Sequence, residues 1–284
     1  MIKLISRKNI NIDKYDGCIK NSIQSRIYAF SWYLDTVSKN WSVLVLNDYE
    51  AVLPISWQRK LFFKLGNQPY FSQQLGVFSK DLISKELQKE FLSQIPIHFF
   101  KVVIHFNSQN YSTENTITLK NYKLILNTDY ASFKKNFSKG RKHAIKVGEK
   151  ASLYVKKTTI AELIKIHKDN YSYKIPYEVL TALSNAILGN RKGFLLGIFK
   201  DEQLLGGALF TDHNNRITYL FAAFTVKGKT LQASSFLLSE VIKKHQNSNL
   251  ILDFEGGNMP SIAKFYRSFD AEEENYFAFK RTLL

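Results

Sequence analysis

The chain has 284 residues, of which 45% are hydrophobic and 14% aromatic, so it can bury a substantial core and is not intrinsically disordered. Its 40 Lys and Arg residues outnumber its 24 Asp and Glu residues and give a net charge of +16. This excess favours a polyanionic partner, such as a nucleic acid, a phosphate-bearing cofactor or an anionic membrane surface, although a lysine-rich proteome would produce it too.

Targeting and redox signals are sparse. Cys18 is the only cysteine, so no intramolecular disulfide can form, which fits a reducing compartment. The N-terminus lacks the apolar core of a signal peptide, and the longest apolar runs fall short of the roughly 20 residues that a membrane helix needs. We therefore expect a soluble cytoplasmic protein without membrane insertion.

Hydrophobic periodicity in the first half predicts a small α/β unit. The expected helices cover residues 25–38 and 81–93, and the expected strands cover residues 41–46, 51–57, 62–65, 74–77, 98–106 and 116–126. Asp81 is expected near the positive N-terminal end of the second helix.

Residues 134–150 change character, because seven Lys and Arg residues crowd the segment against the single acid Glu149. We expect a short basic helix over residues 141–150, which is either a solvated face or a contact for nucleic acid or phosphate through Arg141. The domain boundary is placed here. It gives an N-terminal domain (1–127), a basic helical connector (128–150) and a C-terminal domain (151–284).

The second half has a different order: one strand, two helices, a three-strand meander, and then helix, strand, helix and strand. The expected strands cover residues 152–156, 193–200, 203–211, 216–225, 250–253 and 276–280. Two helices are expected over residues 159–170 and 176–188, and residues 231–271 supply the other two around the strand 250–253. Asp253 and Glu255 follow that buried strand, at the kind of strand end where α/β sheets bind ligands.

This order resembles that of the GNAT acyltransferases. In that family an Asn follows the fifth strand, and the next helix carries an Ala, a Tyr and then a Gly-containing pair. Asn258, Ala263, Tyr266 and the pair Asp270–Ala271 are similar to that pattern, with one extra residue near Pro260.

Further segments resemble the Fem-type branch, whose members contain two tandem GNAT-like domains. They are the helix start Ala233–Leu238, the Asp-Phe-x-Gly of Asp253–Gly256 and the basic segment Ser138–Ile145. The resemblance implies a mixed α+β/α/β fold with two tandem GNAT-like domains, each a mostly antiparallel mixed sheet flanked by helices. The first domain would be a degenerate copy.

The resemblance also suggests where a donor would bind. GNAT enzymes hold the pyrophosphate of acyl-CoA on backbone N–H groups of a glycine-bearing loop before a helix. The corresponding stretch here is atypical, because its glycine is out of register and two lysines have appeared; Fem-type relatives that use aminoacyl-tRNA lack the loop too. The expected cofactor-binding residues are Phe224, Val226, Lys227, Gly228, Lys229, Ala233 and Ser234.

The resemblance places the chemistry after the buried strand. Glu255 is the candidate general base and Tyr266 the candidate proton donor to the leaving group, although both could be structural. A free backbone N–H near Phe224 would hold the acyl carbonyl. Arg141, Tyr173, Lys174, Asp253 and Asn258 are candidate substrate-binding residues, with Asp253 expected mainly to orient the loop.

The histidines show no metal-ligand spacing, and no nucleotide-binding or hydrolase motif occurs, so no metal is expected. The resemblance implies an acyl- or aminoacyl-transferase acting from acyl-CoA or aminoacyl-tRNA on a small-molecule or peptide amine. The alternative is a non-catalytic scaffold or nucleic-acid-binding protein with the same fold.

Overall fold

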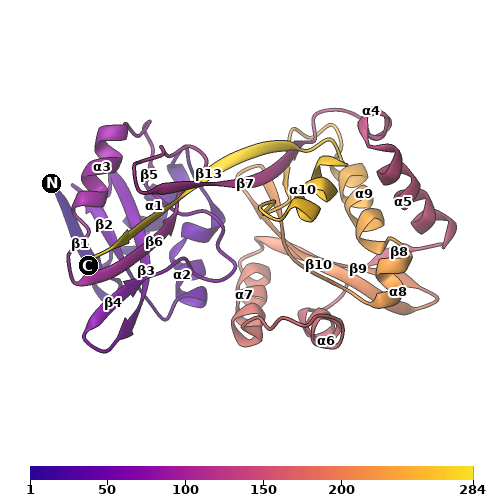
Figure 1. The fold of residues 1–284 in the computed structure, drawn as a ribbon, viewed down its shortest axis with the longest axis horizontal. Coiled ribbons are helices and arrows are strands. Elements are labelled where there is room, and N and C mark those ends of the chain that lie inside the picture. Colours follow the sequence, from indigo (N-terminus) through magenta and orange to yellow (C-terminus); the bar gives the residue numbers. More distant parts are fainter. Residues whose placement is uncertain (284) are drawn as a thin grey trace. The chain divides into compact units, whose positions relative to one another are not determined.

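The computed structural model describes residues 1–283, which form two compact units (Figure 1). Unit 1 contains Met1–Lys120 and the C-terminal segment from Glu274, and unit 2 contains Asn121–Glu273. The chain passes from unit 1 into unit 2 within strand β7 (Thr116–Ile125) and returns within strand β13 (Glu272–Thr282).

Unit 2 begins and ends earlier in the chain than the predicted C-terminal domain (151–284). The basic segment is an integral part of unit 2, because helix α5 (Lys139–Lys150) buries Ala144 and Ile145 and packs against helix α9 (Ala233–His245). The last strand belongs to unit 1, because residues 278–282 of β13 pair with strand β6 (Phe99–His105).

Unit 1 is a sheet in the order β1-β2-β3-β4-β6-β13, with β5 added to β3. Its remaining strands are β1 (Ile2–Ser6), β2 (Asn40–Leu46), β3 (Ala51–Lys60), β4 (Phe63–Gly66) and β5 (Phe78–Ser79). Its helices are α1 (Ile12–Asn21), α2 (Ser31–Val37) and α3 (Lys85–Ser93), with 3₁₀ turns at Arg7–Asn9 and Ile27–Ala29.

Several predicted elements of unit 1 differ in the structure. The predicted helix 25–38 is a 3₁₀ turn followed by the short α2, and the predicted strand 74–77 forms only an isolated bridge between Leu75 and Phe106. Helix α3 begins later than predicted, because the Ser84 hydroxyl accepts the N–H of Leu87 and caps the helix there.

Unit 2 is a mixed sheet in the order β7-β12-β11-β10-β9-β8, antiparallel except for the parallel pair β11–β12. Its strands besides β7 are β8 (Tyr154–Lys156), β9 (Gly193–Lys200), β10 (Gln203–His213), β11 (Arg216–Phe224) and β12 (Ile251–Asp253). Its helices besides α5 and α9 are α4 (Tyr130–Asn136), α6 (Ile160–Asn170), α7 (Tyr177–Gly189), α8 (Val226–Thr230) and α10 (Pro260–Arg267).

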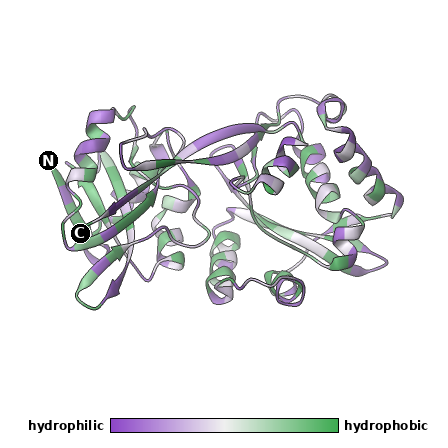
Figure 2. Ribbon diagram, viewed as in Figure 1, coloured by the Kyte–Doolittle hydropathy of each residue, from purple (hydrophilic) through white to green (hydrophobic). Residues whose placement is uncertain are grey.

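The helices of unit 2 cover both faces of its sheet. In Figure 1, α6 and α7 lie on one face of the β9–β10 region, and α5, α9 and α10 lie on the other. Figure 2 shows the reason, since the central strands are mostly hydrophobic whereas α5 and α6 carry one polar side each. The core on the α9 face includes Phe236, Leu237 and Phe254. The predicted mixed sheet flanked by helices is therefore confirmed.

The parallel pair β11–β12 is short and leaves an opening in the sheet. Only residues 216–218 of β11 pair with residues 251–253 of β12, and β12 ends at Asp253 while β11 continues to Phe224. The edge of β11 beyond Thr218 therefore has no partner from β12. An opening beyond the carboxyl ends of parallel strands is where such sheets bind ligands.

Candidate active site

Asp253 holds the loop at the end of β12 in place. Its side chain is 2% exposed and accepts hydrogen bonds from Arg216 Nη1 (2.6 Å), Asn121 Nδ2 (2.9 Å) and the N–H of Glu255 (2.9 Å). The side-chain oxygen of Asn121, Oδ1, also accepts the N–H of Gly256 at 2.9 Å. Asp253, predicted among the substrate-binding residues, thus has the loop-orienting role that the sequence also suggested.

The loop that follows has an unusual backbone. Glu255 lies in the left-handed region (φ +49°), and Gly256 and Gly257 have φ values of +125° and +141°. A left-handed conformation costs a residue with a Cβ atom roughly 1–2 kcal/mol. Such strain persists only where the surroundings impose it, as the Asp253 and Asn121 hydrogen bonds do here, and it is concentrated at functional sites.

Tyr266 on α10 lies within electrostatic range of this loop. It is 7% exposed, and its ring packs 4.8 Å from that of Phe254 between centroids. Burial raises the pKa of the Tyr266 hydroxyl, and the charges of Glu255 and Asp253 raise it further. The phenol is therefore protonated at neutral pH and can donate a proton or a hydrogen bond.

Two more tyrosines converge on the opening between β11 and β12. Tyr219 is in β11 just beyond the last β12 pair, and burial raises its pKa, with further contributions from Tyr266 and Tyr171. Tyr171 follows α6, and its hydroxyl accepts the backbone N–H of Phe224 at 3.2 Å.

This last hydrogen bond corrects one prediction. The N–H of Phe224 was expected to be free, but it is bonded to the Tyr171 hydroxyl, whereas the N–H of the next residue, Thr225, points to Leu205 of β10. The Phe224 N–H does point toward the β12 side of β11, as an oxyanion donor requires. A donor carbonyl would have to displace the Tyr171 hydroxyl to reach it.

The expected phosphate loop is a helical turn. The Thr225 hydroxyl caps α8 by accepting the N–H of Gly228 (3.0 Å), and the N–H of Val226 donates to Asn170 (3.1 Å). Lys227 and Lys229 are exposed, with Lys227 bonded to Gln203 and Lys229 3.9 Å from the Tyr171 ring centroid. The N–H groups of Val226 and Gly228, two of the predicted cofactor-binding residues, thus have partners inside unit 2.

The start of α9 presents a different environment. Gln232 lies in the left-handed region before the helix, and no side chain caps it, while Ala233 is buried and Ser234 half-buried in its first turn. Arg141 of α5 donates to the hydroxyls of Ser235 and Ser268. The macrodipole of an uncapped helix start favours an anion.

Arg141 is a buried cation without a carboxylate. Its side chain lies over the rings of Phe265 and Phe269 (4.1 and 4.4 Å to the centroids), and it makes no ion pair within residues 1–283. Burial lowers the pKa of the guanidinium to about 10, so it stays charged at neutral pH. A guanidinium without a carboxylate partner, lying beside the start of a helix, attracts a phosphate group.

Tyr173 and Lys174 lie in the exposed link between α6 and α7. Tyr173 is 58% exposed and meets His167 edge-on at 4.9 Å, and Lys174 is exposed. His167 is fully buried, with its ring stacked on Tyr171 (4.7 Å) and its Nδ1 3.1 Å from the Tyr177 hydroxyl. The link, two of whose residues were predicted to bind substrate, is thus packed as an aromatic cluster. Asn258 is exposed in the loop before α10.

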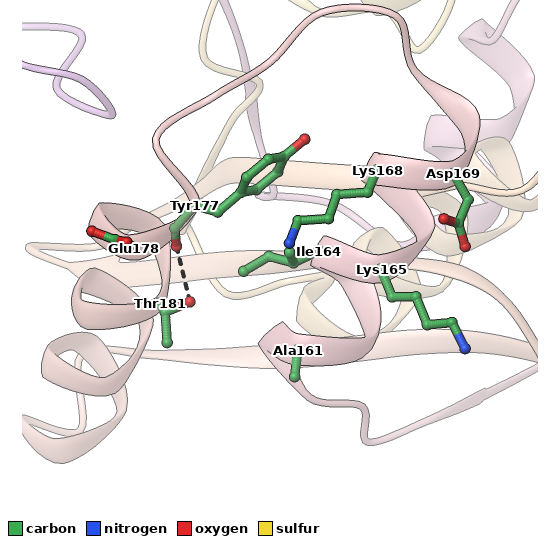
Figure 3. A pocket seen from close by; sticks show the side chains of 8 residues that line it. All are labelled: Ala161, Ile164, Lys165, Lys168, Asp169, Tyr177, Glu178 and Thr181. Carbon is green, nitrogen blue, oxygen red and sulfur yellow. Dashed lines mark hydrogen bonds between the residues drawn. The ribbon is translucent and has the colours of Figure 1, made fainter.

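A cavity of about 460 Å³ lies between α6 and α7 (Figure 3). Tyr177 joins it to the aromatic cluster, because the ring lines the cavity while the hydroxyl contacts His167. The cavity carries both charge signs and contains none of the predicted catalytic or cofactor-binding residues. Its lining is Ala161, Ile164, Lys165, Lys168, Asp169, Tyr177, Glu178 and Thr181.

The buried His167 predicts an acid-sensitive unit 2. Burial lowers the pKa of His167, and the charge of Lys229 lowers it further, so below about pH 6.5 the unfolded chain binds a proton that the folded chain does not. Stability must then fall as the pH falls below that value. We expect His167→Phe to show a smaller loss of melting temperature than the wild type between about pH 7.5 and 5.5. Parallel pH dependences of the two proteins would contradict this.

Residues 1–283 contain no group of three or more His, Cys, Asp or Glu side chains placed to hold a metal ion. No helix among them combines the length and the hydrophobicity that a bilayer crossing requires.

Comparison of the sequence with family models and with curated proteins finds no match. The fold does have counterparts among solved structures. FemX superposes with a TM-score of 0.68 at 11% identity, over 97% of this chain and 96% of FemX. A conserved protein of unknown function from Bacteroides thetaiotaomicron VPI-5482 gives 0.63 at 11% identity, over 99% of this chain and 100% of that one.

A tandem GNAT protein from the clavulanic acid biosynthesis pathway gives a TM-score of 0.55 at 10% identity, over 99% of this chain and 98% of the other. At such identities a likeness establishes the fold alone. The chain thus has the tandem GNAT-like, Fem-type fold, and the predicted resemblance is confirmed.

Proposed function

We propose that this protein transfers an acyl or aminoacyl group from a thioester or ester donor to the amine of a small molecule or peptide. The observation that carries the proposal is the strained Glu255 loop just past the end of β12, with Tyr266 within electrostatic range of it and the open edge of β11 leading to the Phe224 N–H. In this scheme unit 2 holds the reacting groups and unit 1 is the degenerate GNAT-like copy.

The chemistry needs one bond made and one broken, without a covalent enzyme intermediate. The amine nitrogen attacks the donor carbonyl carbon, Glu255 takes the proton that the nitrogen loses, and the Phe224 N–H stabilises the oxyanion. The carbon–sulfur or carbon–oxygen bond then breaks, and Tyr266 protonates the leaving group. Its raised pKa keeps that proton available at neutral pH.

The donor is proposed to place its phosphate at the start of α9, near Arg141. The uncapped helix start and the buried, unpaired guanidinium supply the positive potential there. Aminoacyl-tRNA is favoured over acyl-CoA, because residues 226–230 form a helical turn whose Val226 and Gly228 N–H groups have protein partners. The net charge of +16 suits a nucleic-acid donor as well.

Native mass spectrometry of the protein with acyl-CoAs and with charged tRNA tests the donor. We expect a complex with one of them that Arg141→Met weakens and Lys142→Met leaves largely unchanged. Lys142→Met is a matched control, because the substitution removes the same charge from the adjacent position. The Lys142 Nζ bonds only the carbonyl oxygen of Lys135 (2.6 Å). If neither donor binds, the proposed transferase activity is contradicted.

Tyr171→Phe should tighten donor binding. The hydroxyl competes with the donor carbonyl for the Phe224 N–H, and one hydrogen bond contributes about 0.5–1.5 kcal/mol, so KM for the donor should fall up to about tenfold. The ring and its stacking on His167 are retained. A rise in KM would show instead that the hydroxyl contacts the donor.

The alternative is a non-catalytic protein that binds nucleic acid through α5. Lys139, Lys146 and Lys150 are exposed on that helix, and a patch of this kind binds phosphates without chemistry. In that case affinity for RNA would fall steeply as salt rises, and Glu255→Gln would change neither binding nor any biological phenotype.

A further inference from the structure

The hairpin that joins β3 to β4 in unit 1 ends in an apolar tip. Phe62 is 94% exposed and Leu61 79% exposed, and no other large hydrophobic residue among residues 1–283 is as exposed as Phe62. In Figure 1 this hairpin forms the lower end of unit 1, and Figure 2 shows hydrophobic colour at its tip. Leaving such side chains in water is unfavourable, and proteins that do so generally use them for contact.

The turn itself does not favour these residues. Leu61 has a φ of +54°, in the left-handed region where hairpin turns normally place Gly, Asn or Asp. A leucine there makes the turn less stable than those residues would. The tip thus combines backbone strain with solvent exposure, and neither stabilises unit 1.

A second exposed residue extends the apolar surface. The N–H of Lys64 donates to the carbonyl oxygen of His98 at 3.1 Å, which holds the hairpin beside the loop that contains Ile97, itself 82% exposed. The rings of Phe63 and Phe100 lie 5.1 Å apart and brace the hairpin from the neighbouring strand. The apolar tip is therefore held against the sheet by backbone and ring contacts.

Cations surround this tip, and acids are missing from it. Arg59, Lys60 and Lys64 flank the two exposed residues, and Lys101 lies on the adjacent strand. Neither residues 57–66 nor residues 94–106 contain an aspartate or glutamate. Lys64 lies over the ring of Trp57 at 4.3 Å, so the aromatic residue at the base of the hairpin is capped by positive charge.

We propose that the β3–β4 hairpin is a peripheral membrane contact that inserts Phe62 and Leu61 between the head groups of an anionic bilayer. The side chains at the tip would lie at the acyl boundary while Arg59, Lys60 and Lys64 lie at the level of the lipid phosphates. Apolar tips ringed by cations bind anionic interfaces by adding buried apolar area to electrostatic attraction. The contact involves one leaflet only and needs no spanning helix.

A bilayer fits this surface better than a protein partner does. The exposed apolar residues sit on a projecting two-residue turn, and the core of a protein interface is normally depleted of charge, whereas cations flank this tip on both sides. A lipid surface accepts a projecting tip and neutralises every cation around it.

Flotation with vesicles of phosphatidylcholine containing phosphatidylglycerol, compared with phosphatidylcholine alone, tests the contact on the full chain. The wild type should bind only the anionic vesicles, and Phe62→Ser should weaken binding about tenfold or more. Lys60→Gln should weaken it about fivefold. Because these side chains are exposed, the variants should have the same melting temperature as the wild type.

Two matched controls distinguish vesicle binding by the tip from nonspecific binding by other exposed side chains. Leu82→Ser removes an apolar side chain that is 84% exposed elsewhere in unit 1, and Lys192→Gln removes the same charge as Lys60→Gln from an exposed position in unit 2. Both should bind like the wild type. As a direct probe, Phe62→Trp should be quenched by brominated lipids and Leu82→Trp should not.

Three results would overturn the proposal. The wild type could fail to bind anionic vesicles at low salt, or the control variants could lose as much binding as the hairpin variants. In the third, Phe62→Ser would dissolve a dimer seen by sedimentation and leave vesicle binding unchanged, which would assign the tip to a second copy of the chain.

Discussion

Replacing Asp253 with alanine will lower the free energy of unfolding by about 3–5 kcal/mol, because it removes the buried carboxylate that pairs with the Arg216 guanidinium and holds the loop after β12. Arg216 and Asp253 have side chains that are only 11% and 2% exposed, and their closest atoms are 2.6 Å apart. The substitution also removes the acceptor for Asn121 and for the N–H of Glu255. Thermal and urea unfolding of the full chain measure the loss.

A double-mutant cycle identifies the cause. Arg216→Met removes the cation that pairs with Asp253. The double variant should therefore lose less stability than the sum of the two single losses, by about 0.5–3 kcal/mol. Asp48→Ala is a matched control in unit 1, because the side chains of its ion pair with Lys14 are 73% and 48% exposed, and the loss of that pair should cost at most about 1 kcal/mol. Equal losses for Asp253→Ala and Asp48→Ala would contradict this explanation.

Glu255→Gln and Tyr266→Phe will slow acyl transfer by about 10²–10⁴-fold each, the usual contribution of a positioned acid or base. Glu255→Gln keeps the size of the side chain, and Tyr266→Phe keeps the ring that packs on Phe254. Neither should change the melting temperature much, so the loss should appear in kcat with donor KM nearly unchanged. Steady-state kinetics with the donor that binds measure it.

Tyr122→Phe is the matched control for Tyr266→Phe. The two rings are neighbours with centroids 6.3 Å apart, but the Tyr122 hydroxyl donates to Glu273 at 3.1 Å. Removing that hydroxyl should slow transfer far less. Comparable losses from both tyrosines would mean that the effect is one of packing and would remove Tyr266 from the chemistry.

Local signals in the sequence predicted much of unit 2. The apolar run before Asp253, the meander and the helix that contains Phe236 and Leu237 appear in the structure within a few residues of their predicted bounds. Their hydrophobic periodicity is strong, because these elements are buried in the core. Glu255 and Tyr266 were named as candidate base and acid through the family resemblance. Burial raises the pKa of Tyr266, and the charge of Glu255 raises it further, so the two interact.

Features that depend on distant pairing were missed. The return of β13 to unit 1 and the bond between Asn121 and Asp253, 132 residues apart in the chain, have no local signature. Helix α1 was missed because its sequence is mostly polar and contains Gly17, so only Tyr15 and Ile19 report its buried face. Residues 226–230 were read as a loop, since the capping by Thr225 that makes them helical is not a hydrophobic pattern.

Two site residues could be identified only from the structure. Nothing in the sequence of the link after α6 joins the Tyr171 hydroxyl to the Phe224 N–H. Tyr219 was hidden inside an apolar strand. A polar ring in the middle of the run 216–224, on the strand expected to flank the opening, was the available signal for it.

The most direct test of the proposed activity is a single-turnover assay with an isotope-labelled acyl donor and a panel of small-molecule and peptide amines, read by mass spectrometry. We expect a labelled amide from one donor class with the wild type, and a rate reduced at least about 10²-fold with Glu255→Gln. Donor consumption that is the same with wild type, with Glu255→Gln and without protein would contradict it.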